Sequence, residues 1–200
     1  MRSRFGHSAA AGKGWRPWAV LVPVIGLGFV AATVVSLTAL LQHVGLVDPD
    51  ENPVGLIGFM AFLLVPFAAL GAVVIAWVRL VERRGLASIG LGGARPWRLF
   101  FCGLLAGIAM VTVIVTGIYL IGGCRIVEFG GSFHSSVALG SIAVLLAGFI
   151  LQSSVGELLF RGWMFSAVTT KLGNGWGVVL SSLAFTVMHF DPRGTWLVKA

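Results

Sequence analysis

The sequence predicts an all-α fold, a polytopic transmembrane helix bundle with about five spans. Of the 200 residues, 58% are hydrophobic and only 10% are charged, whereas a soluble domain carries about 25% charged residues. The mean hydropathy is +0.98, and long apolar runs alternate with short polar or basic segments. So few polar residues cannot cover a soluble globule, which excludes a soluble enzyme and a disordered chain.

The net charge of +7 indicates a membrane topology and not a nucleic-acid interface. The basic residues cluster beside the apolar runs, which is the pattern of cytoplasmic loops in membrane proteins. A nucleic-acid-binding domain would instead spread them over one continuous face. We therefore expect the lipid bilayer as the surroundings of the chain and no nucleic acid as a partner.

The first predicted span covers residues 18–41 and follows a basic tail, residues 1–17. The tail carries Arg2, Arg4, Lys13 and Arg16. A basic tail before an apolar run is also the pattern of a secretory signal peptide. The run is longer than the apolar region of a cleaved signal, about 7–15 residues, and fits a spanning helix of about 20 residues.

Two N-terminal transmembrane helices and a basic loop form the second predicted region, residues 18–98. An acidic loop with two prolines, residues 48–53, precedes the second span, residues 54–78. The segment 79–98 then carries five arginines against one glutamate. Because lysine and arginine concentrate in cytoplasmic loops, we expect this loop and the N-terminus to be cytoplasmic.

The third predicted region, residues 99–200, contains three more apolar segments. They are residues 99–121, residues 137–151 with a continuation into 157–161, and residues 176–190. Glycine and asparagine in residues 172–175 predict a break before the last segment. The alternation places Lys171 on the cytoplasmic side, whereas Arg193 and Lys199 would fall outside, against the positive-inside pattern.

One acid and one base lie inside the fourth apolar segment. Glu157 and Arg161 are spaced i,i+4, with the acid before the base, which is the favourable order for an ion pair on one helix face. Charged side chains inside a membrane are costly and are often functional. Two interpretations stay open, a functional site and a buried salt bridge that only fixes helix packing.

A single histidine, His189, ends the last apolar segment. Such a residue can be an interfacial or hydrogen-bonded side chain, or it can be a metal ligand. One imidazole does not hold zinc, because a catalytic zinc site needs about three protein ligands and a water.

Together the two segments resemble the CPBP family of intramembrane metalloproteases. They read Glu-Leu-Leu-Phe-Arg-Gly-Trp over 157–163 and Ser-Ser-Leu-Ala-Phe-Thr-Val-Met-His over 181–189. The family includes the type II CAAX prenyl endopeptidases and bacteriocin-processing or self-immunity (Abi-like) homologues. Its first motif is Glu-Glu-x-x-x-Arg, its second is Phe-x-x-x-His, and its third is His-x-x-x-Asn or Asp.

The resemblance implies peptide-bond hydrolysis at a membrane, in this case a bacterial plasma membrane. It assigns catalytic roles to Glu157, Arg161 and His189, with His189 as a metal ligand or as an oxyanion stabiliser. It also implies zinc or another divalent metal as cofactor, and a peptide or membrane-protein substrate. Residues 99–200 would form a partial protease-like membrane core.

The sequence departs from the family pattern at two places. Gly156 occupies the position of the first glutamate, which is the family's proposed general base, and glycine takes no proton. No third motif follows His189 within the 200 residues, so we expect a C-terminally truncated core, with or without a metal. Replacement of the missing base by Glu157 is disfavoured, because adjacent helix residues point about 100° apart and Glu157 would have to leave Arg161.

Two functional interpretations follow from these departures. The first is an intramembrane metalloendopeptidase of the CAAX-processing type. The alternative is a degenerate or truncated homologue that acts as a non-enzymatic membrane binding or immunity protein. A partner membrane protein would then complete the helix core. A transporter or channel subunit is disfavoured, because the first three spans contain no charged residue in their interiors.

Overall fold

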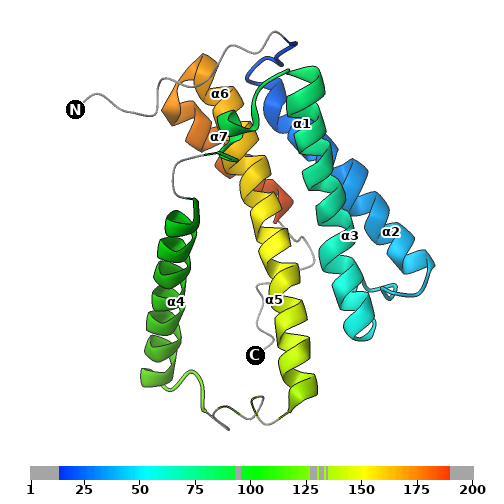
Figure 1. Ribbon diagram of the computed structural model, residues 1–200, viewed down its shortest axis with the longest axis vertical. Helices are drawn as coiled ribbons and strands as arrows, with labels where there is room; N and C mark the ends of the chain where they lie inside the picture. Colours follow the sequence, from blue (N-terminus) through cyan, green and yellow to red (C-terminus); the bar gives the residue numbers. More distant parts are fainter. Residues whose placement is uncertain (1–13, 93–95, 127–129, 131–132, 134, 190–200) are drawn as a thin grey trace, which may run out of the picture. The chain divides into compact units, whose positions relative to one another are not determined.

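The computed structural model describes residues 14–92, 96–126, 130, 133 and 135–189 (Figure 1). Of the predicted basic tail only residues 14–17 are among them, and Arg193 and Lys199 lie outside them. The chain forms two compact units. One consists of Met1–Leu91 with Val144–Ala200, and the other of Gly92–Ala143.

Every regular element in the described ranges is a helix, which confirms the predicted all-α class. The helices are α1 (Leu21–Val30), η1 (Ala31–Val35), α2 (Ser36–His43), α3 (Gly55–Ala76), η2 (Trp77–Val81), η3 (Leu86–Ile89), α4 (Pro96–Leu120), α5 (Ser136–Glu157), η5 (Leu158–Met164), α6 (Phe165–Leu172) and α7 (Asn174–Met188). Here η1, η2 and η5 are π-helical turns and η3 is a 3₁₀ turn.

Four continuous helical segments are long and apolar enough to cross a membrane, namely Leu21–His43, Gly55–Val81, Trp97–Leu120 and Ser136–Leu172. They correspond to the first four predicted spans, so the chain is a polytopic integral membrane protein. The fifth predicted span, 176–190, is found as α7, an apolar helix of 15 residues. A helix of that length reaches about 22 Å into a hydrocarbon core of about 30 Å.

The fourth segment is longer than predicted. The sequence pattern placed its end near residue 161, but the helix continues through η5 and α6 to Leu172, 37 residues in all. The break predicted at 172–175 is a sharp turn at Gly173, whose φ is +85°. Glycine adopts this conformation without steric penalty. α6 and α7 therefore form a helical hairpin.

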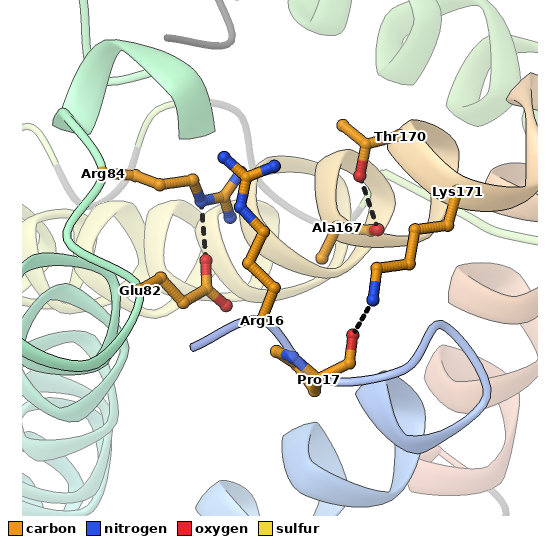
Figure 2. Close-up of a pocket in the computed structure, with 7 residues that line it drawn as sticks. All are labelled: Arg16, Pro17, Glu82, Arg84, Ala167, Thr170 and Lys171. Carbon is orange, nitrogen blue, oxygen red and sulfur yellow. Dashed lines mark hydrogen bonds and ion pairs between the residues drawn. The ribbon is translucent and has the colours of Figure 1, made fainter. Parts of the chain in front are cut away.

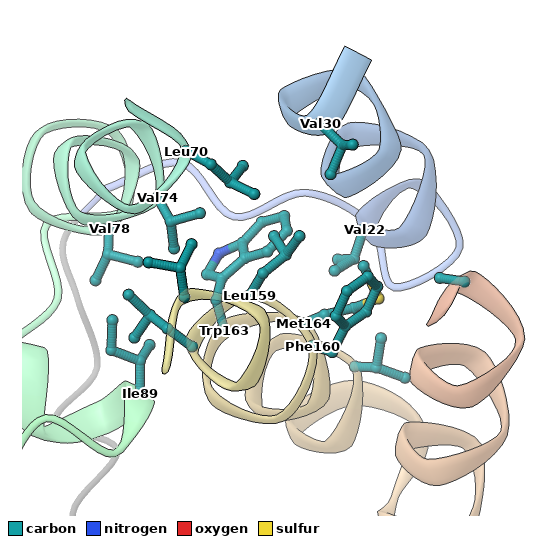
Figure 3. Packing of buried hydrophobic residues seen from close by; sticks show 14 of the residues in the cluster. Val22, Val30, Leu70, Val74, Val78, Ile89, Leu159, Phe160, Trp163 and Met164 are labelled. Atoms are coloured by element: carbon teal, nitrogen blue, oxygen red, sulfur yellow. The ribbon is translucent and has the colours of Figure 1, made fainter. Parts of the chain in front are cut away.

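The hydrophobic core of the larger unit surrounds the π-helical turn η5. Trp163, Leu159 and Met164 of this turn are fully buried, and Figure 3 shows them between α1 and α3. Phe29 of α1 packs against Trp163 with ring centroids 5.5 Å apart. On α1, a Cβ at Gly26 would lie 2.5 Å from the end of the Met164 side chain, so a larger residue there would require this flexible side chain to move.

A buried carboxylate fastens the end of η2 to η5. Glu82 has no exposed surface, and one of its oxygens accepts hydrogen bonds from the indoles of Trp77 (3.0 Å) and Trp163 (2.8 Å). The other oxygen accepts a hydrogen bond from Arg84 Nε at 2.6 Å. In the sequence Glu82 stands out only as one acid in a basic loop, so this buried role was not predicted.

The short turn η3 lies against the same π-helical turn. A Cβ at Gly162 would lie 2.5 Å from the backbone oxygen of Ile89, at the end of η3. The absence of a side chain at position 162 therefore allows the loop after Glu82 to pack directly on η5.

Glu82→Gln is expected to lower the stability of the protein in detergent by about 3 kcal/mol, because it leaves Arg84 as a buried charge without its counter-ion. The thermal unfolding midpoint measures this loss. Glu51→Gln removes an exposed carboxylate and should change the midpoint little. Equal midpoints for both variants would contradict the proposed importance of the Glu82 carboxylate.

Gly162→Ala is expected to destabilise the protein by about 1–3 kcal/mol, since the added methyl group must displace backbone and not a flexible side chain. Gly156→Ala is the matched control on the same helix, because a Cβ there meets nothing within 4 Å. Thermal unfolding of both variants in the same detergent tests the contrast. A midpoint for Gly162→Ala at or above that of Gly156→Ala would show that η3 does not pack on this glycine.

Candidate functional site

The predicted ion pair is present on the long membrane-crossing helix. Glu157 is the last residue of α5, and Arg161 lies within η5. Arg161 Nη1 donates to both carboxylate oxygens, at 2.7 and 2.8 Å. The Glu157 side chain is 56% exposed and the Arg161 side chain is 79% exposed in the described part of the chain. The pair presents a carboxylate and a guanidinium at the surface of the unit.

His189 follows the last residue of α7 and is also exposed. Its Nδ1 lies 2.9 Å from the backbone oxygen of Phe185, and its ring stacks on the Phe185 ring with centroids 4.1 Å apart. A carbonyl oxygen only accepts, so this hydrogen bond needs the proton on Nδ1. In the neutral ring Nε2 is then free to accept a hydrogen bond or to bind a ligand.

An aromatic contact joins the two sequence motifs. Phe160, between Glu157 and Arg161, is buried and meets the Phe185 ring edge to face, with centroids 5.3 Å apart. Glu157 precedes the Gly173 turn by sixteen residues and His189 follows it by sixteen. Glu157 and His189 are therefore equally far from the turn along the sequence of the two arms. In the sequence Phe160 is only one of the residues between Glu157 and Arg161, so its contact with Phe185 was not predicted.

Gly156 lies one residue before Glu157 in the last turn of α5. A Cβ built on it would meet nothing within 4 Å, so the surroundings do not exclude a larger side chain. A glutamate would therefore find space at this position, and packing does not require the glycine. Glycine contributes no acid or base to the site.

The described side chains do not fit a catalytic metal. No group of three or more histidine, cysteine, aspartate or glutamate residues among them is placed to hold a metal ion. Glu157 and His189 would supply at most two ligands, and Glu157 is paired with Arg161. A zinc site needs about three protein ligands. The assignment of His189 as a metal ligand therefore stays a prediction from the resemblance.

The part of the chain that contains these residues is similar to a known protein family. Residues 138–199 match the family model of the type II CAAX prenyl endopeptidases, Rce1-like. No curated protein and no solved structure matches the chain. The match spans α5, η5, α6 and α7, including Glu157, Arg161 and His189. Residues 138–199 of this integral membrane protein are therefore similar to the type II CAAX prenyl endopeptidases, in agreement with the resemblance of their two motifs.

Proposed function

We propose that this protein binds a peptide segment of a membrane-associated substrate at Glu157, Arg161 and His189, and that it does so without cleaving it. The observation that carries the proposal is the Phe160–Phe185 contact, which supports a common site for the ion pair and the histidine. The family match supports a peptide as the ligand.

The chemistry of the three side chains suits a peptide backbone. An extended peptide in a membrane has N–H and C=O groups that find no partner in lipid. Arg161 offers hydrogen-bond donors and Glu157 offers acceptors. His189 uses Nδ1 to bond to Phe185, and its Nε2 can bind the peptide. Exposed polar side chains within a membrane are costly when they face lipid alone. Binding a peptide would lower that cost.

Binding without cleavage is favoured by the missing general base. Hydrolysis needs a group that takes a proton from the attacking water, and position 156 holds glycine. Both oxygens of the neighbouring carboxylate, Glu157, already accept hydrogen bonds from Arg161. The proposed role is that of the non-enzymatic binding or immunity type of homologue.

A second candidate function is peptide-bond hydrolysis with Glu157 as the base. The exposure of Glu157, 56% of its side chain, favours this candidate, because a substrate and a water can approach it. Its position, as far from the Gly173 turn along the sequence as that of His189, would bring an acid–base pair to the same substrate bond. The carboxylate would have to exchange Arg161 for the water first.

The test is a binding and cleavage assay with the full chain in proteoliposomes and a fluorescent prenylated peptide with a CAAX ending. We expect saturable binding by fluorescence anisotropy and an intact peptide by mass spectrometry. Arg161→Gln and His189→Ala should each weaken binding by about tenfold, the effect of losing one charge-assisted or buried hydrogen bond. Ser153→Ala, one turn before Glu157 and exposed, is the matched control and should bind normally.

The outcomes separate the two candidate functions. Cleavage that disappears in both Glu157→Gln and His189→Ala would replace the first candidate by the second. Binding that is unchanged in Arg161→Gln and His189→Ala would show that the peptide, if it binds, does so elsewhere.

We also propose a bacterial plasma membrane with the N-terminus on the cytoplasmic side. Arg16, Arg84 and Lys171 come from three separate segments and line one pocket of the larger unit (Figure 2). Their convergence supports the prediction that the three basic segments share one side, and lysine and arginine favour the cytoplasmic side.

Cysteine labelling tests this orientation in a Cys102→Ser, Cys124→Ser background. An impermeant maleimide should label Thr170→Cys and Ser88→Cys only from the cytoplasmic face. It should label Asp50→Cys only from the opposite face, because the membrane-crossing helix α3 lies between positions 50 and 88. The parent without cysteine is the control for unspecific labelling. Labelling of Asp50→Cys and Ser88→Cys from the same face would contradict the topology.

A further inference from the structure

A basic pocket lies at one end of the larger unit, away from the peptide site. Arg16 precedes α1, Arg84 follows η2, and Lys171 lies near the end of α6. These three cations line the same pocket as the buried carboxylate of Glu82 (Figure 2). Arg84 is only 5% exposed, so the charge of its guanidinium lies inside the protein.

Glu82 supplies the single carboxylate among the residues that line the pocket, and both of its oxygens already accept hydrogen bonds. Its two oxygens accept hydrogen bonds from two indoles and from Arg84 Nε. Lys171 donates to the backbone oxygen of Pro17 at 2.9 Å, which is a neutral partner. Three positive charges and one negative charge therefore line this pocket, and neither Arg16 nor Lys171 has a carboxylate partner among the described residues.

Several donors of the pocket are buried without a partner. Arg16 Nε, Arg16 Nη2 and Arg84 Nη2 are covered and make no hydrogen bond to any described residue. Figure 2 shows the two guanidinium groups pointing toward one another. Buried donors without acceptors cost free energy, and two like charges add repulsion. An anion between them would remove both costs.

We propose that this pocket binds the phosphate group of an anionic membrane lipid. Guanidinium groups match phosphate oxygens with paired N–H donors, and Lys171 adds a compact charge at the rim. Trp15 and Trp18 are exposed beside the pocket residues in sequence, and tryptophan marks the headgroup level of membranes. Basic pockets between transmembrane helices at that level bind anionic headgroups.

The proposal is tested by lipid-dependent thermal stability of the full chain in neutral detergent. Short-chain phosphatidylglycerol, short-chain phosphatidylcholine and inorganic phosphate are titrated separately at constant ionic strength. We expect phosphatidylglycerol to raise the unfolding midpoint with saturation, and phosphatidylcholine to raise it less. Arg16→Gln and Lys171→Gln should each weaken the apparent affinity for phosphatidylglycerol by about tenfold, as expected for one charge-assisted contact.

The control is Arg79→Gln, which removes the same charge from the same basic segment at an exposed position outside the pocket. It should leave the affinity unchanged. Arg16 and Lys171 are mutated because neither bonds to Glu82, so the Glu82–Arg84 pair stays intact in these variants.

Each result decides the proposal. An unfolding midpoint that rises with phosphatidylglycerol but not with inorganic phosphate identifies a lipid as the source of the phosphate. An equal rise with inorganic phosphate that is lost in Arg16→Gln supports a phosphate site but overturns the lipid as its ligand. Equal stabilisation by phosphatidylcholine, or equal weakening by Arg79→Gln and Arg16→Gln, overturns the proposal.

Discussion

The fold of the larger unit depends on the buried carboxylate of Glu82. Its partners Trp77 and Trp163 lie on two different helical segments, so one side chain joins the end of the second span to the middle of the fourth. Removing a carboxylate from water is expensive unless its oxygens are satisfied. Here two indoles and a guanidinium satisfy them. The surrounding core residues fix the position of η5, which contains Arg161 of the candidate site.

The candidate site and the basic pocket are linked through this π-helical turn. Trp163 faces the Glu82 carboxylate, while Arg161, two residues earlier, is exposed with Glu157. Extra residues in helical turns of the π type often occur at functional sites. In this protein the wider turn lets one short stretch present aromatic residues to the core and a charged pair to the surface.

Much of this arrangement could be predicted from the sequence. Lipid cannot satisfy backbone polar groups, so long apolar runs must be helices, and four of the five predicted spans have spanning length. The Glu157–Arg161 pair depends only on i,i+4 spacing, and the Gly173 turn depends on a local glycine. The motifs themselves indicated the family that residues 138–199 match.

The remaining features depend on contacts between distant residues. Glu82 and Trp163 are 81 residues apart, and without the fold the glutamate looks like one acid among solvated arginines. Phe160 resembles any other apolar residue of the span, and only the hairpin shows that it meets Phe185. The predicted fourth span extended into residues 157–161, and the helix continues to Leu172, where the predicted break begins. The added part of the helix, α6, packs along α7.

The Gly173 turn has a consequence for how this segment tolerates changes in length. Glu157 and His189 stand at matched distances along the two arms of the hairpin. One inserted or deleted residue in either arm would rotate the more distant part by about 100° and shift it by about 1.5 Å. The motif residue on that arm would then leave the shared surface, although every residue of the motif was still present. Relatives that keep this site should therefore differ by substitution between the motifs and hold their spacing fixed.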